Sequence, residues 1–222
     1  KVTLYEKDNR LGGLLNIATI PPYKEELGNF LGYLTRQMKK HGVKVRLGEE
    51  FTEATLKRDK PEVVVLATGR TTPDPDIPGI EKDNVVSFTD ALNGAKEIGY
   101  RVLIIGGGKI GCEVAEFLNK KGKQVTVFEK LPKVIRDIGP TTRFSVMMRL
   151  KASGIKLETN ARVVRIAENG VEVERNGARE FFKGDTVVLA TGSKSNDKLA
   201  KQLEGKISVP LYHVGDCSEP NW

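Results

Sequence analysis

The sequence predicts an α/β fold made of two similar domains, each with a parallel sheet, together with one three-stranded antiparallel meander. Three observations lead to this prediction. In Arg101–Lys130 a glycine-rich turn joins an apolar run to a helical pattern, and a second apolar run follows. The hexapeptides at 2–7 and 125–130 read VTLYEK and VTVFEK. Ala-Thr-Gly follows an apolar run twice, at 67–69 and 190–192, so the chain contains an internal repeat.

The stretch Arg101–Lys130 has the residue order of a dinucleotide-binding βαβ unit. Because the chain repeats parts of this pattern, both domains are predicted to be Rossmann-like. Residues 102–105 are all apolar, as in a parallel strand that is buried on both faces. The pattern Gly106-x-Gly108-x-x-Gly111 follows directly. The first glycine permits a tight turn, the second lets a pyrophosphate approach the backbone, and the third lets the helix pack on the sheet. A glycine pattern alone is weak evidence, but here the strand, the helix and a later acid all have the expected spacing.

The helix predicted after the glycine turn presents one apolar stripe. Its unpaired N-terminal amides and the positive end of its dipole lie where the charge of a phosphate would be. The helix ends at Lys120-Lys121-Gly122, with cations at the negative end and a glycine that can take a left-handed cap. The stripe consists of Ile110, Val114, Phe117 and Leu118.

Glu129 ends the second strand of this unit, where its carboxylate can accept hydrogen bonds from an adenosine ribose diol. A carboxylate at this place repels a 2′-phosphate, which favours NADH over NADPH. Lys130 beside it can tolerate a 2′-phosphate, so both cofactors stay open, with NADH favoured.

The composition fits a globular protein of one or two domains. The chain has 222 residues, of which 39% are hydrophobic and 29% charged. The net charge of +7 comes from scattered cations that never interleave with aromatic residues, which argues against nucleic-acid binding. No apolar stretch reaches the length of a membrane span, and no signal peptide is recognised. Cys112 and Cys217 form no CxxC pair, which predicts a reducing, cytoplasmic compartment and no metal cluster or redox disulphide.

The first copy of the repeat is predicted to be incomplete. Glu6 takes the ribose-binding place, and the spacing of the central unit puts the matching first strand and glycine loop before Lys1. Two helices follow by pattern at 27–38 and 52–58, and two strands at 43–47 and 63–66. The return segment passes through 211–214 into Gly215-Asp216.

The second copy continues past Glu129 with a helix at 140–152, a strand at 155–157 and a buried strand at 187–189. Asn169-Gly170 and Asn176-Gly177 read as hairpin turns, which predicts a meander over 161–182. The chain crosses between domains near 89–99. The predicted division is a partial dinucleotide-binding domain at 1–92, a complete one at 93–204 and a return segment of the first domain at 205–222.

The two tandem folds, each with an acid after its second strand and a later ATG, and with a terminal Gly215-Asp216, resemble flavoprotein reductases with two dinucleotide-binding domains. The segments LGGLLNIATIPPYKEE, DIGPTTRF and YHVGDCSEP resemble the C-terminal half of the 2,4-dienoyl-CoA reductase, NADH oxidase and trimethylamine dehydrogenase family. The resemblance covers essentially the whole chain. In that family an N-terminal barrel holds FMN, a [4Fe-4S] cluster and the substrate, while the C-terminal half binds FAD and NAD(P)H.

The resemblance implies two sets of cofactor-binding residues and no catalytic or metal-ligating side chain. The NAD set is Gly106, Gly108, Lys109, Ile110, Gly111, Glu129, Lys130, Ala190, Thr191 and Gly192. The FAD set is Glu6, Lys7, Gly12, Gly13, Ala67, Thr68, Gly69, Gly215 and Asp216.

The activity implied by the resemblance is hydride transfer from NADH or NADPH to FAD, with electrons passing on to an FMN and iron-sulfur domain of the same full-length protein. No membrane or nucleic-acid partner is expected, and an oligomer stays open. Because the first glycine loop is not in the chain, we expect the fragment to bind FAD poorly and to be inactive alone.

Other interpretations of the same residues stay open. The glycine loop and Glu129 fit a non-catalytic ADP-binding module, as in the amine dehydrogenase branch, equally well. Asp216 can simply end a strand and cap a helix, and Cys112 fits a buried small residue better than a redox group. A disulphide reductase is disfavoured because the cysteine pair is missing. His41 and His213 have no third ligand that would make a metal site.

Overall fold

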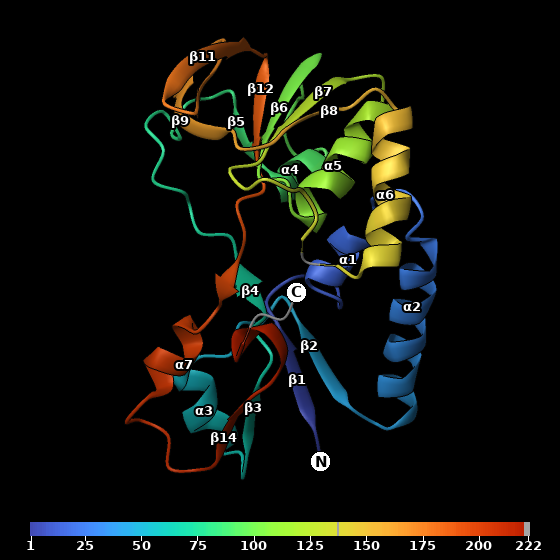
Figure 1. Ribbon diagram of the computed structural model, residues 1–222. Coiled ribbons are helices and arrows are strands. Elements are labelled where there is room, and N and C mark those ends of the chain that lie inside the picture. Colours follow the sequence, from blue (N-terminus) through green and yellow to red (C-terminus); the bar gives the residue numbers. More distant parts are fainter. Residues whose placement is uncertain (137, 220–222) are drawn as a thin grey trace. The chain divides into compact units, whose positions relative to one another are not determined.

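The computed structural model describes residues 1–136 and 138–219 (Figure 1). Asp137 of the DIGPTTRF segment and the end of the predicted 205–222 segment, Trp222 included, lie outside the described residues. The chain divides into two compact units. Unit 1 contains Lys1–Thr19, Tyr23–Thr71 and the described residues from Ser193 on, and unit 2 contains Thr72–Gly192 with Ile20–Pro22.

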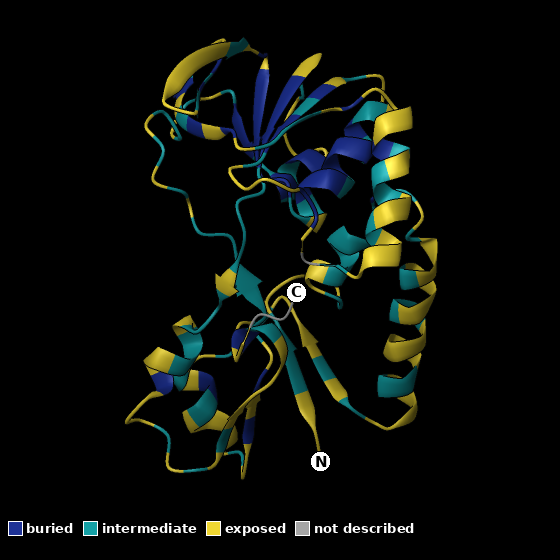
Figure 2. Cartoon of the chain, in the orientation of Figure 1, coloured by how far each residue is buried: buried dark blue, intermediate teal, exposed yellow. Residues whose placement is uncertain are grey.

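Unit 2 is built on a five-stranded parallel sheet in the order β5-β12-β6-β7-β8. The apolar, β-branched runs seen in the sequence form its central strands, and Figure 2 shows these strands as buried. Val102 and Ile104 of β6 are fully buried, as a strand with neighbours on both sides and layers on both faces requires. The strands are β5 (Val85–Ser87), β6 (Arg101–Ile105), β7 (Gln124–Phe128), β8 (Lys156–Glu158) and β12 (Thr186–Leu189).

The helices of unit 2 confirm the predicted βαβ order. The helix α5 (Lys109–Lys120) packs against β6 and β7, and two residues of its predicted stripe, Val114 and Leu118, are 0% and 1% exposed. It ends before Gly122, which has a φ of 78°. The predicted helix at 140–152 is α6 (Pro140–Ala152). The short α4 (Phe88–Asn93) follows β5.

A three-stranded antiparallel meander completes unit 2, as predicted. Asn176 and Gly177 have φ values of 50° and 79°, the left-handed pair of a type I′ hairpin turn. The other turn falls one residue earlier than predicted, because Gly170 already opens the second strand. The strands are β9 (Arg162–Ala167), β10 (Gly170–Arg175) and β11 (Ala178–Lys183).

The meander covers one face of the parallel sheet. Leu103 and Ile105 of β6 share a buried apolar cluster with Val163 and Val171 of the meander. The Phe128 ring meets the Phe182 ring edge-on at 4.9 Å between centroids. Alternate residues of β6 therefore face two different layers, which fixes the register of the strand that leads into the glycine turn.

Unit 1 contains three separate strand pairs. Two are parallel, β1-β2 and β14-β3, and one is antiparallel, β13-β4. Its strands are β1 (Thr3–Glu6), β2 (Lys44–Leu47), β3 (Val64–Leu66), β4 (Arg70–Thr71), β13 (Lys194–Ser195) and β14 (Leu211–His213). Its helices are α1 (Leu14–Ala18), α2 (Glu25–Lys40), α3 (Glu53–Asp59), α7 (Lys198–Leu203) and the 3-10 turn η1 (Gly215–Cys217).

The core of unit 1 is small. Val64, Leu66, Leu203 and Cys217 form one buried cluster, which draws α7 and η1 onto β3. The 16-residue helix α2 has no buried residue, and Phe30 on it is 52% exposed. Residues on β1 and β2 are coloured as intermediate or exposed in Figure 2.

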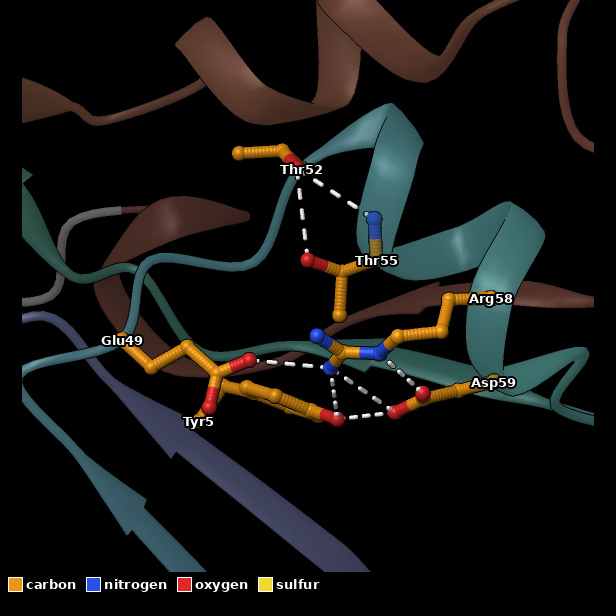
Figure 3. A network of polar contacts seen from close by, with 6 residues as sticks. All are labelled: Tyr5, Glu49, Thr52, Thr55, Arg58 and Asp59. Atoms are coloured by element: carbon orange, nitrogen blue, oxygen red, sulfur yellow. Dashed lines mark hydrogen bonds and ion pairs between the residues drawn. The ribbon is translucent and has the colours of Figure 1, made fainter.

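A polar network on unit 1 joins α3 to β1 and to the end of β2 (Figure 3). Arg58 donates to Asp59 at 2.7 Å, to Glu49 at 2.9 Å and to the Tyr5 hydroxyl at 3.1 Å, and Tyr5 donates to Asp59. Arg58, and to a smaller extent Tyr5, lowers the pKa of Asp59 to about 2. The Asp59 carboxylate in turn raises the pKa of Tyr5. Thr52 caps α3 by accepting from the Thr55 N–H at 3.3 Å.

The boundaries of the two units differ from the predicted division at 92/93 and 204/205. Residues 85–87 belong with unit 2, because β5 pairs with β12 in its sheet. Residues 198–203 belong with unit 1, because Leu203 of α7 is buried in the core of that unit. The crossing is predicted near 89–99, whereas the chain passes from unit 1 to unit 2 after Thr71, and α4 occupies Phe88–Asn93.

Candidate nucleotide-binding sites

The glycine turn of unit 2 leaves no room for side chains. A Cβ atom on Gly106, whose φ is 110°, would lie 2.2 Å from the Ala190 carbonyl oxygen. A Cβ atom on Gly111 would lie 1.9 Å from the Gly106 carbonyl oxygen. Gly108 is the N-cap of α5, so no side chain of that residue covers the N-terminus of the helix. The structure therefore brings the predicted residues of the turn and the second ATG together.

Glu129 lies beside this turn with both carboxylate oxygens held by backbone amides. Its Oε2 accepts from the Gly107 N–H at 2.8 Å, and its Oε1 accepts from the Leu131 N–H at 2.8 Å. Two further bonds fix the backbone there, from Ala161 N to Glu129 O at 3.0 Å and from Asn160 N to Leu131 O at 3.1 Å. A carboxylate oxygen can accept more than one hydrogen bond, so a ribose diol still finds acceptors on it.

Gly107 is a residue of this site that sequence reasoning missed. A Cβ atom there would lie 2.7 Å from Val134 Cγ1 and 2.8 Å from Glu129 Cβ. Its carbonyl oxygen accepts from the Ile135 N–H at 2.7 Å and from the Cys112 thiol at 3.7 Å. The signal that the sequence offers is the run of three consecutive glycines, whose middle member is not part of the GxGxxG pattern.

The second ATG contributes an unpaired hydroxyl near the glycine turn. Within the described residues, the Thr191 Oγ1 atom is buried and has no hydrogen-bond partner. Gly192 follows with a φ of 104°, and Ala190 donates its N–H to Ile105 O at 2.9 Å. A buried hydroxyl without a partner is costly, so its place beside a predicted cofactor fits a ligand that supplies one. Lys130, also predicted for this site, is exposed.

Glu6 of unit 1 repeats the backbone pattern of Glu129. Its Oε1 accepts from the Asp8 N–H at 3.0 Å, and its carbonyl oxygen accepts from the Glu49 N–H at 3.1 Å. The Gly48 N–H donates to Asp8 O at 3.0 Å, which corresponds to the bond from Asn160 N to Leu131 O in unit 2. Lys7 next to Glu6 is exposed. Three equivalent bonds thus fix the turn at the acid of each unit, and one of them goes to the carboxylate.

Gly12 and Gly13 lead into α1, a short helix that the sequence analysis did not predict. Gly12 has a φ of 115°, and a Cβ atom there would lie 2.7 Å from Asn16 Nδ2 and 2.8 Å from Leu31 Cδ2. Gly13 is the N-cap of α1, with a φ of 47°. Both positions require glycine because of their backbone conformation.

The first ATG is braced from the returning chain. Thr68 donates its hydroxyl to Asn196 O at 2.7 Å, and the Asn196 side chain donates to Thr68 O at 3.1 Å. Asn196 N also donates to Gly69 O at 3.0 Å. Sequence reasoning missed Asn196, because 128 residues separate it from Thr68. Ala67 connects this braced turn to β3.

Asp216, predicted for the flavin, lies in η1 after Gly215, whose φ is 67°. Its Oδ2 lies 3.5 Å from Nε of Arg70, the residue that follows the first ATG. The structure therefore brings Asp216 near the end of β3, and its contact with the flavin stays a prediction. Cys217 beside it is buried and donates its thiol to Leu66 O at 3.1 Å.

The remaining candidates for redox or metal chemistry lie apart. Cys112 and Cys217 are both buried, and neither forms a disulphide. Within the ranges 1–136 and 138–219, no group of three His, Cys, Asp or Glu residues could hold a metal ion. A search of the same ranges found no helix with the length and apolar character needed to cross a membrane.

A family model described as pyridine nucleotide-disulphide oxidoreductase matches residues 57–209. The chain belongs to this family. Bilirubin reductase from Mediterraneibacter gnavus is 35% identical over 219 residues, which are 99% of this chain and 34% of that protein. NADH oxidase from Thermoanaerobacter brockii is 36% identical over 223 residues, covering 98% of this chain and 34% of that protein.

A solved structure of 2-naphthoyl-CoA reductase in complex with 2-naphthoyl-CoA matches the fold with a TM-score of 0.95 and 31% identity. The match covers 100% of this chain and 34% of that one. The chain thus spans about a third of the length of the relatives it matches. It is the FAD- and NAD(P)-binding part of a flavoprotein oxidoreductase, and the predicted resemblance is confirmed.

Proposed function

We propose that this chain is the electron-input module of a longer flavin-dependent reductase, in which unit 2 binds NADH and unit 1 binds FAD. The observation that supports this most is the repeated setting of Glu6 and Glu129. Two dinucleotides that share an adenosine ribose call for two such acids, one in each unit. When both are bound, the nicotinamide and the flavin supply a hydride transfer.

In unit 2 the protein binds and orients the nicotinamide dinucleotide. Gly106, Gly108 and Gly111 let the pyrophosphate approach the backbone at the N-terminus of α5, where the amides of Lys109 and Ile110 begin the helix. Glu129 accepts from the ribose diol, with Lys130 beside it. The second ATG borders the site and offers the Thr191 hydroxyl. These roles need no side-chain acid, base or nucleophile.

In unit 1 the protein holds the flavin dinucleotide through residues from four places in the chain. Glu6 with Lys7 serves the adenosine ribose, and Gly12 and Gly13 allow close approach of the flavin. The first ATG, held by Asn196, offers a fixed edge. Asp216 after Gly215 accepts from the ribityl chain, with Arg70 beside it.

The relatives support a division of labour along the full-length protein. Two proteins that share this third of their length are named as reductases of different compounds, bilirubin and 2-naphthoyl-CoA. A shared part with different named compounds fits a common electron supply, with the acceptor selected elsewhere. We therefore propose that electrons pass to an N-terminal barrel with FMN and a [4Fe-4S] cluster. We also propose that the protein is cytoplasmic and has no membrane or nucleic-acid partner.

Calorimetry on the chain tests the NADH assignment. We expect saturable NADH binding at one site, weaker NADPH binding because Glu129 repels the 2′-phosphate, and weaker ADP binding because ADP lacks the nicotinamide half. Tighter binding of NADPH than of NADH would overturn the cofactor preference.

The second candidate is a structural ADP-binding module without catalysis. The bonds that define the site in unit 2 surround the adenosine diphosphate half, which ADP and NADH share. Equal affinity for ADP and NADH in the same calorimetric titration would favour this function over electron input.

A further inference from the structure

Residues 130–136 leave the end of β7 and return to the glycine turn, and we call this segment the strap. The strap meets the turn at Ile135, whose N–H donates to Gly107 O at 2.7 Å. Val134 and Ile135 are 3% and 1% exposed, so their side chains anchor this end of the strap. The exposed residues of the strap include three cations, Lys130, Lys133 and Arg136.

Gly107 links the strap to the carboxylate that we assign to the ribose. Its N–H donates to Glu129 Oε2 at 2.8 Å, while its carbonyl oxygen accepts from Ile135. The side of Gly107 is closed by Val134 Cγ1 and Glu129 Cβ, which a Cβ atom would meet at 2.7 and 2.8 Å. A backbone shift at Ile135 is therefore transmitted to the Glu129 carboxylate through one residue.

Ile135 has an unfavourable backbone conformation. Its φ is 51°, a region that β-branched residues rarely adopt. Its buried side chain compensates, because leaving this conformation would withdraw the side chain from its apolar surroundings. A shorter side chain would lose these apolar contacts, so the backbone could relax to a negative φ. That change would move the N–H of residue 135 away from the Gly107 carbonyl oxygen.

We propose that Ile135 is a positioning residue that fixes the Glu129 carboxylate through Gly107, so that the site takes a free ribose 2′-hydroxyl and rejects a 2′-phosphate. This rests on the proposed binding of NADH in unit 2. A fixed carboxylate cannot turn away from a 2′-phosphate, so the anion is repelled even though the strap presents cations nearby. Once the carboxylate is released, Lys130, Lys133 and Arg136 are free to attract the phosphate.

The test compares Ile135→Ala with Ile155→Ala in this chain. Both changes remove the same atoms from a buried isoleucine of unit 2, with 1% and 6% exposure in the native chain. Ile155, however, lies just before β8 and donates its N–H to Leu150 O at 3.3 Å rather than to the turn. Calorimetry measures NADH, NADPH, ADP and adenosine 2′,5′-bisphosphate, and a thermal melt records stability. The last two ligands isolate the 2′-phosphate from the nicotinamide.

We expect Ile135→Ala to narrow the NADH-to-NADPH affinity ratio by about tenfold or more, since the hydrogen bond from Gly107 to the charged Glu129 carboxylate is lost once Ile135 releases Gly107. The ADP-to-bisphosphate ratio should narrow in parallel. Ile155→Ala should lower stability to a similar extent and keep both ratios. Adding Lys133→Gln to Ile135→Ala should reverse part of the gain in NADPH affinity. Unchanged ratios in a folded Ile135→Ala chain would overturn the proposal.

If Ile135→Ala does not fold, Gly107→Ala probes the same link from the other side, because its Cβ atom displaces Glu129. Its ratios should narrow in the same way, and unchanged ratios would count against the proposal. Failure of the proposed function has a different result, since the unaltered chain would then bind no NADH or bind it no better than ADP.

Discussion

Unit 1 and unit 2 fix the turns at their acids by three equivalent hydrogen bonds but surround the acids differently. In unit 2, Glu129 has a second amide partner in Gly107, at the end of the central strand β6. In unit 1 the pairs β14-β3 and β1-β2 correspond to β5-β12 and β7-β8, and no described strand takes the place of β6 between them. Within the described residues, the Glu6 carboxylate accordingly has one hydrogen-bond partner, the Asp8 N–H.

The difference appears in burial as well. Val102 and Ile104 of β6 are fully buried, whereas Val65 of β3 and Tyr212 of β14 are 57% and 56% exposed. The turn at each acid is bonded to the residues that follow the neighbouring strand, β2 or β8, and forms in both units. Burial, and the second partner of the carboxylate, depend on a complete sheet. One neighbouring strand is therefore enough for the acid turn, and the full strand order determines how firmly the acid is held.

The largest effect is expected for Gly111→Ala. Its Cβ atom would lie 1.9 Å from a backbone oxygen, which cannot be relieved by a side-chain movement. We expect calorimetry to detect no NADH binding, and we expect the free energy of unfolding to fall by about 3 kcal/mol. Gly139→Ala is the matched control, because a Cβ atom there meets nothing within 4 Å. A Gly111→Ala chain that still binds NADH would show that the turn is not the pyrophosphate site.

Removing the partner of a buried acid in unit 2 should have the next largest effect. Arg149 on α6 donates to Glu116 on α5 at 2.7 Å, and the Glu116 side chain is 5% exposed. Arg149→Ala should lower the free energy of unfolding by about 2 kcal/mol, less than for a fully buried pair because Arg149 is partly exposed. Lys57→Ala in unit 1 breaks an exposed pair with Glu53 and should leave the denaturant midpoint unchanged. Equal losses of unfolding free energy in the two variants would contradict the expected difference between the buried and the exposed ion pair.

Glu129→Ala and Glu6→Ala compare the two acids directly. Glu129→Ala should weaken NADH binding by about 1 to 3 kcal/mol and also free two backbone amides. Glu6→Ala frees one amide and should leave NADH binding intact. Calorimetry and thermal unfolding measure both effects. An unchanged NADH affinity in Glu129→Ala would place the ribose elsewhere.

The smallest effect concerns the acid stability of unit 1. Arg58 and Tyr5 lower the pKa of Asp59 to about 2, and Lys206 and Lys57 do the same for Glu53. Because these values lie below those of the unfolded chain, their stabilisation is complete above pH ~4 and is lost as the pH falls towards ~2. The protection of α3 amides from hydrogen exchange, relative to their intrinsic rates, should fall over this interval. Asp59→Asn should weaken the dependence of this protection on pH. An unaltered pH profile would argue against the network.

Much of the fold follows from local patterns. The order of β6, the glycine turn, α5 and β7 was predictable because strand period, glycine spacing and helix stripe all agree within thirty residues. The meander was predictable from its Asn-Gly turns. The bounds of the units were not, because they depend on which sheet β5 joins and on where α7 is buried.

The structure brings together the candidate residues that a motif names, and their binding of a cofactor stays a prediction. Gly107, Ile135 and Asn196 were missed, since their roles come from contacts between segments that are distant in the chain. The left-handed conformation of Ile135 contradicts its local preference, and local conflicts of this kind occur where tertiary contacts override propensity.

The most direct test of electron input is an anaerobic titration of the full-length protein with NADH, followed by the visible absorbance of its flavin. Our account predicts that the protein carries FAD and that NADH bleaches this absorbance, with NADPH less effective. A full-length protein that holds no FAD, or whose flavin absorbance is unchanged by NADH, would contradict it.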